Sequence, residues 1–152
     1  MNNIEIIKYI CFGISFLIGG IIFSFQDDLM NPKMYSKALY ASGLCFLIGV
    51  ILELSDFFYI ERGMTLLVMS IGIIYVAYFK LFLNLFIKWK GTKPIITSAS
   101  SMIGGGPIGG FTTKYDAKRR ITGADFIFSF VQALVPIFTI FGLLILIIEL
   151  NR

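Results

Sequence analysis

Residues that could carry out chemistry are few and scattered in this chain. It has no histidine, and its two cysteines stand far apart in the sequence. Without histidine, a Ser-His-Asp or Cys-His catalytic group is excluded, and so is the commonest general base. No CxxC pair offers metal ligands at the usual spacing. The sequence therefore predicts no catalytic residue, no metal, no cofactor and no enzymatic activity.

The two cysteines, Cys11 and Cys45, lie inside apolar stretches. Cys11 falls about three residues from the outer edge of its stretch and Cys45 about nine, which separates them by roughly 9 Å along a membrane normal at about 1.5 Å per helical residue. That offset exceeds what a disulfide bridge allows. We expect two free thiols.

Composition indicates a membrane protein. Hydrophobic residues make up 57% of the chain and charged residues 14%, and the mean hydropathy is +0.87, whereas soluble proteins have about a quarter charged residues. The apolar residues gather in four blocks, each near the roughly 20 residues that a helix needs to cross a bilayer. We predict one all-α, polytopic domain over residues 1–152, with spans at about 8–26, 38–55, 63–87 and 125–149.

The charges that flank the spans predict their orientation. Four spans place the first and third connections on one side and both termini on the other. Nine basic residues fall in those two connections: Lys33, Lys37, Lys88, Lys90, Lys93, Lys114, Lys118, Arg119 and Arg120. Three fall on the opposite side: Lys8, Arg62 and Arg152. The positive-inside rule then predicts a plasma (bacterial inner) membrane protein with both termini outside and a cytoplasmic loop at 88–124.

Two stripes of small residues predict where helices pack. Small residues recur every fourth position in the first two spans, at Cys11, Ser15 and Gly19 and at Ala41, Cys45 and Gly49. In lipid, close backbone approach at small residues is a main source of helix association. We expect the two stripes to face each other in an antiparallel hairpin. The alternative is a subunit interface, and we expect a homo-oligomer.

Polar residues inside the spans offer a second group of candidates. Gln132, with Pro136 four residues later, is typical of a pore-lining position or of a kinked, hydrogen-bonded helix contact. Glu53 continues the second small-residue stripe at the outer edge of its span. It is either a solvated interfacial carboxylate or an ion or proton site.

The third connection is the most distinctive segment outside the spans, because loops longer than about 15 residues are uncommon unless they are functional or disordered. Its candidate contact residues are Lys88, Trp89, Lys90, Gly104, Gly105, Gly106, Gly109, Gly110, Lys118, Arg119 and Arg120. No GxxxxGK[ST] motif accompanies these glycines, so the nucleotide signal is weak. The basic residues favour anionic lipid headgroups or a cytosolic protein. Nucleic acid is not expected, since three adjacent charges without a folded platform are poor support for it.

These observations favour a small integral membrane scaffold or sensor subunit. In this interpretation it oligomerises and docks a cytosolic partner through the basic, Gly-rich loop, as accessory, immunity, defence or secretion components do. The alternative is an oligomeric ion channel or small transporter, for which Gln132 is the main candidate residue. A lipid-modifying enzyme has the least support, because no cluster of acid, base and nucleophile falls at one depth.

Overall fold

A computed structural model describes residues 3–96 and 122–152, and every regular element in these two ranges is a helix. The elements are α1 (Asn3–Ser24), the 3-10 helix η1 (Gln26–Met30), α2 (Pro32–Leu54), α3 (Met64–Lys90) and α5 (Gly123–Leu150). The all-α prediction is confirmed. Residues 97–121, which hold the Gly-rich part of the third connection, lie outside the described ranges.

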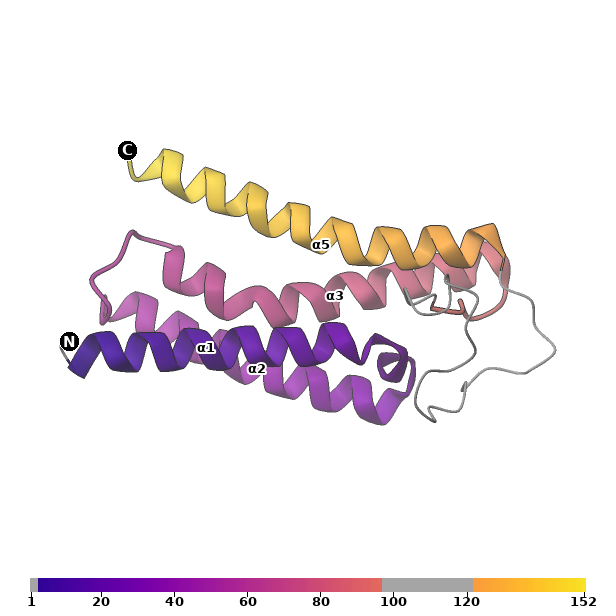
Figure 1. The fold of residues 1–152 in the computed structure, drawn as a ribbon, viewed down its shortest axis with the longest axis horizontal. Coiled ribbons are helices and arrows are strands. Elements are labelled where there is room, and N and C mark those ends of the chain that lie inside the picture. Colours follow the sequence, from indigo (N-terminus) through magenta and orange to yellow (C-terminus); the bar gives the residue numbers. More distant parts are fainter. Residues whose placement is uncertain (1–2, 97–121) are drawn as a thin grey trace.

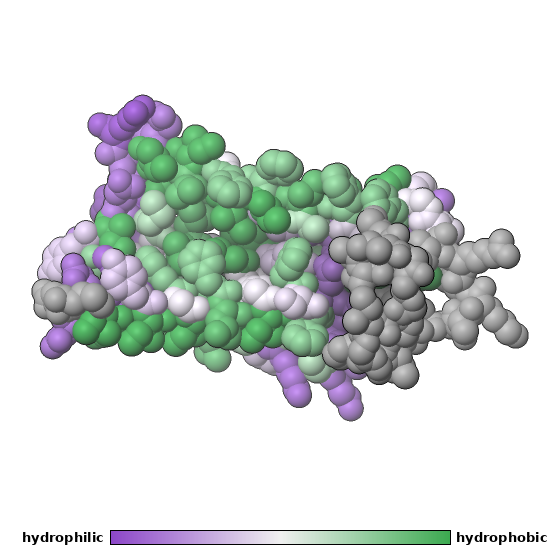
Figure 2. Space-filling model, viewed as in Figure 1, coloured by the Kyte–Doolittle hydropathy of each residue, from purple (hydrophilic) through white to green (hydrophobic). Residues whose placement is uncertain are grey.

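All four long helices can cross a membrane. They contain 22, 23, 27 and 28 residues, or about 33 to 42 Å at roughly 1.5 Å per residue, against a hydrocarbon core of about 30 Å. Many large apolar side chains on their outer faces are exposed. Figure 2 shows this green apolar surface along the helices, with hydrophilic residues at the end that carries the termini. The four helices are therefore suited to integration in a bilayer.

Several helix ends lie beyond the apolar blocks that predicted them. Helix α1 begins at Asn3 instead of residue 8, α3 continues to Lys90, and α5 begins at Gly123. Hydropathy marks where a chain leaves lipid, whereas capping groups mark where a helix ends. Gly91 ends α3 with a left-handed φ of 70° and donates its N–H to the Ile87 carbonyl at 2.8 Å. Helices α3 and α5 thus extend into the predicted loop at 88–124 from either side.

Helix α3 is the centre of the arrangement. In Figure 1 it lies between the α1–α2 pair and α5, and the start of α1 and the end of α5 are both at the end of the molecule opposite η1. Helix α3 contacts all three other long helices, while α1 and α2 contact each other much less. The outer helices therefore depend on α3 for most of their packing.

Ser15, Gly19 and Gly49 of the small-residue stripes lie against α3, whereas the expectation placed the two stripes against each other. The Ser15 hydroxyl donates a hydrogen bond to the Val68 carbonyl at 2.8 Å. A Cβ atom at Gly19 would lie 3.2 Å from the Ile71 side chain, and one at Gly49 would lie 2.5 Å from Met69 Cβ. Small residues on α1 and α2 allow the backbone of each helix to approach α3 closely. Side chains of α3 fill the space that larger residues on α1 and α2 would occupy.

The other stripe residues lie on the same inner side or at its edge. Cys45 is buried, whereas Cys11 and Ala41 are half-buried, and both cysteines are free thiols. Helix α3 adds a small residue of its own, because a Cβ atom at Gly72 would lie 3.1 Å from Ser42 Cβ. Helices α2 and α3 therefore lie close together at two places, Ser42–Gly72 and Gly49–Met69.

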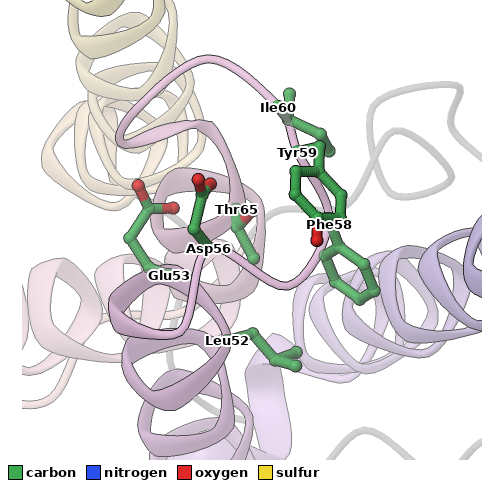
Figure 3. A pocket seen from close by; sticks show the side chains of 7 residues that line it. All are labelled: Leu52, Glu53, Asp56, Phe58, Tyr59, Ile60 and Thr65. Atoms are coloured by element: carbon green, nitrogen blue, oxygen red, sulfur yellow. The ribbon is translucent and has the colours of Figure 1, made fainter.

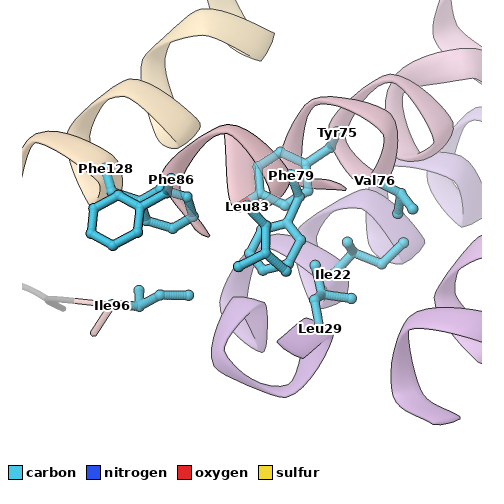
Figure 4. Close-up of a cluster of buried hydrophobic side chains, with 9 residues drawn as sticks. All are labelled: Ile22, Leu29, Tyr75, Val76, Phe79, Leu83, Phe86, Ile96 and Phe128. Carbon is cyan, nitrogen blue, oxygen red and sulfur yellow. The ribbon is translucent and has the colours of Figure 1, made fainter. Parts of the chain in front are cut away.

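An apolar core joins the helices near η1 (Figure 4). Its rings meet edge to face, with centroid distances of 6.4 Å for Phe79–Phe128 and 5.4 Å for Phe86–Phe128. Ile96, beyond the end of α3, is part of the same core. The chain that leaves α3 therefore folds back against α5. The buried members are Ile22, Leu29, Tyr75, Val76, Phe79, Leu83, Phe86, Ile96 and Phe128.

Candidate functional site

The basic end of α3 presents three of the predicted contact residues. Lys88, Trp89 and Lys90 are all exposed. The Lys90 ammonium lies 4.1 Å from the centroid of the Trp89 ring, within the range of a cation–π interaction. Trp89 in turn meets the buried Phe86 ring edge to face at 6.2 Å. This contact orients an aromatic ring and a cation together at the helix end.

One buried carboxyl group ties the chain on both sides of the Gly-rich connection. Asp125 has no exposed surface. Its Oδ1 accepts the Ile95 N–H at 2.8 Å. Its Oδ2 accepts the Thr122 N–H at 2.9 Å and the Thr122 hydroxyl at 2.6 Å. Asp125 therefore holds the segment after α3 against the first turn of α5.

No role for Asp125 was predicted from the sequence, in which this residue only marks the edge of a span. A local signal was present, because Thr122 and Asp125 have the spacing of a capping box and form one in the structure. The bond to Ile95 had no such signal, since it joins residues 30 positions apart.

The other eight predicted contact residues of the loop lie outside the described residues. They are Gly104, Gly105, Gly106, Gly109, Gly110, Lys118, Arg119 and Arg120. Of the contact set, the structure therefore brings together only Lys88, Trp89 and Lys90.

A polar cluster lies in the interior, around the predicted Gln132. The Gln132 amide is fully buried and donates to Gln26 Oε1, which also accepts the Tyr75 hydroxyl at 2.9 Å. These three residues come from α5, η1 and α3. Gln132 Oε1 is buried and has no hydrogen-bond partner within the described ranges. Pro136 is buried one turn further along α5, and the helix continues through it. The cluster joins the α1–α2 hairpin to the α3–α5 pair.

Glu53 is a helix cap. Its carboxylate accepts the N–H of Gly63, and the N–H of Leu66 at 3.3 Å, at the N-terminus of α3. The positive end of the helix dipole favours an anion there. Figure 3 shows Glu53 beside Asp56 beneath the loop that leads into α3. This geometry gives Glu53 a structural role that neither sequence interpretation included.

Among residues 3–96 and 122–152, no three His, Cys, Asp or Glu side chains lie close enough to hold a metal ion. Comparisons of the chain with protein-family models, with curated proteins and with solved structures find no match. The site must therefore be interpreted from its own geometry.

Proposed function

We propose that this chain is a membrane-integral scaffold or sensor subunit that docks a cytosolic protein at the basic end of α3. The observation that carries the proposal is the exposed group of Lys88, Trp89 and Lys90, in which a cation and an aromatic ring are already in contact. Tryptophan is a typical anchor of protein interfaces, and the two lysines add positive charge that favours an acidic partner surface. The Gly-rich segment that follows completes the docking surface in this proposal.

The fold supports this role through the bonds made by Asp125. Binding residues are often carried on connections that a rigid scaffold positions. Here the start and the end of the connection are held together, because Asp125 bonds both Ile95 and Thr122. The proposed scaffold is a homo-oligomer in the plasma membrane, and its partner is an acidic protein surface.

The proposal requires the basic end to face the cytoplasm, as the distribution of charge predicts. Thiol labelling of Thr92→Cys and Asn151→Cys variants, made without Cys11 and Cys45, tests this orientation in intact cells. A membrane-impermeant reagent should label position 151 and leave position 92 unlabelled until the cells are opened. The reverse pattern would show that the orientation is inverted.

Loss of charge at the end of α3 should weaken docking. In the full chain purified in mild detergent, the double variant Lys88→Gln, Lys90→Gln should retain about tenfold less of an acidic cytosolic protein than the wild type, because rim charges govern encounter and specificity. Added salt should reduce the wild-type signal towards that of the variant. Quantitative proteomics of the co-purified proteins measures both effects.

The matched control is Lys33→Gln, Lys37→Gln, which removes the same charge at the start of α2. It should leave docking unchanged. Equal loss in both double variants, or no cytosolic protein enriched by the wild type, contradicts the proposal.

An ion channel or small transporter is the second candidate. It is favoured by Gln132 Oε1, which is buried and has no hydrogen-bond partner among the described residues. In that case, Gln132→Ala should change ion flux in reconstituted vesicles, and the two lysine variants should have no effect on it. The docking proposal expects no flux from any of these proteins.

A further inference from the structure

An apolar groove runs between the end of α3 and the start of α5. Phe86 and Phe128, both buried, form part of it, and their rings meet edge to face. Leu85 and Trp89 line it from α3, and Ile127 lines it from α5. The groove has a volume of about 380 Å³, which is within the range of ligand pockets, roughly 300 to 1,000 Å³. Its lining is almost entirely apolar, so it suits a hydrocarbon chain.

A cation stands beside this groove. Trp89 lines the groove, and the Lys90 ammonium lies over the Trp89 ring at 4.1 Å. Tryptophan and lysine at the end of a membrane-spanning helix usually lie at the level of the lipid headgroups. The groove therefore combines an apolar cleft at the depth of acyl chains with a positive charge at the depth of phosphates.

We infer that the groove binds one anionic phospholipid, with an acyl chain along Phe86 and Phe128 and its phosphate at Lys90. Charge complementarity selects this occupant. A zwitterionic lipid could fill the cleft but would gain less from the ammonium, and an apolar helix of a second copy would leave the ammonium without an anion. The inferred lipid site shares Trp89 and Lys90 with the proposed docking surface. Its test uses vesicles without any cytosolic protein, so its outcome is separate from that of the docking experiment.

Trp89 makes the inference measurable, because it is the only tryptophan in the chain. The full-length protein is reconstituted into vesicles of phosphatidylcholine, in which a brominated phosphatidylglycerol or a brominated phosphatidylcholine replaces part of the lipid. Bromine on the acyl chain quenches Trp89 fluorescence when that chain occupies the groove. The relative binding constant should favour phosphatidylglycerol about fivefold, the factor that corresponds to roughly 1 kcal/mol per basic residue near a membrane surface.

Two variants and one control variant test whether the lipid preference arises at the groove. Lys90→Gln should remove the preference for phosphatidylglycerol, while Lys33→Gln, with the same loss of charge at the start of α2, should keep it. Val131→Phe narrows the groove from α5 and should reduce quenching by both brominated lipids. The exposed lysine variants do not depend on repacking of the interior, so their result stands if Val131→Phe does not fold.

Three results would overturn the inference. Equal quenching of the wild type by both lipids would show an unselective annular contact. Weak quenching by both would show that protein covers the groove, either a second copy or another part of this chain. An equal loss of preference in Lys33→Gln and Lys90→Gln would show general attraction of anionic lipid to a basic protein.

Discussion

Gly49→Ala should destabilise the folded protein by about 1 to 3 kcal/mol, the usual cost of overpacking a well-packed contact. The added Cβ atom would lie 2.5 Å from Met69 Cβ and 3.1 Å from Met69 Cγ. The Cβ of Met69 is attached to the backbone of α3 and cannot rotate away, so α2 and α3 must move apart. Thermal unfolding in mild detergent, followed by size-exclusion chromatography, measures the loss.

Alanine variants of two other glycines serve as comparisons for Gly49→Ala. At Gly43, also on α2, a Cβ atom meets nothing within 4 Å. Gly43→Ala should therefore be neutral or stabilising by up to about 1 kcal/mol, because alanine is the better helix former. Gly19→Ala should fall between the two, since its contact at 3.2 Å is with a side-chain methyl of Ile71. Equal stability of the Gly49 and Gly43 variants would place the tight contact elsewhere.

The small-residue stripes show how far the sequence could predict the packing. Their four-residue spacing indicated one side of α1 and one side of α2, on which Ser15, Gly19, Cys45 and Gly49 are buried and Cys11 and Ala41 are half-buried. The partner helix could not be predicted. In a membrane both the lipid-facing and the protein-facing sides of a helix are apolar, so hydropathy does not distinguish a contact with a neighbouring hairpin from a contact with α3.

For the polar contacts, too, the sequence indicated some of the residues involved but not their partners. Gln132 was a candidate from sequence because an amide inside a span needs a partner. That partner, Gln26, lies 106 residues away, in a turn between two other helices. The exposed residues at the end of α3 were predicted by their position and type alone. Asp125 was missed because an acidic residue at a span boundary usually faces water, and only the folded chain shows that it is fully buried.

Asp125→Ala should cost about 2 to 4 kcal/mol and release the chain that follows α3. The substitution removes the acceptor of the Ile95 N–H and breaks the capping box with Thr122. A buried donor left without a partner costs about 1 to 3 kcal/mol, and loss of an N-terminal cap costs about 1 kcal/mol. The Ile95 amide, which is buried and bonded at 2.8 Å in the wild type, should exchange its hydrogen faster in the variant. Hydrogen exchange followed by mass spectrometry of the peptide over residues 91–96 measures this directly.

The same variant separates the positioning of the docking residues from their charge. Lys88, Trp89 and Lys90 are unchanged in Asp125→Ala, yet docking should weaken, because the end of the connection is no longer held beside its start. Asp125→Asn retains one oxygen that can accept the Ile95 N–H, so it should keep most of the protection of that amide. Glu61→Ala, which removes an exposed acidic residue at the other end of the molecule, should leave exchange, stability and docking at wild-type values. Unchanged exchange at Ile95 in Asp125→Ala would show that the packing of Ile96 in the apolar core, and not the bond to Asp125, holds this segment in place.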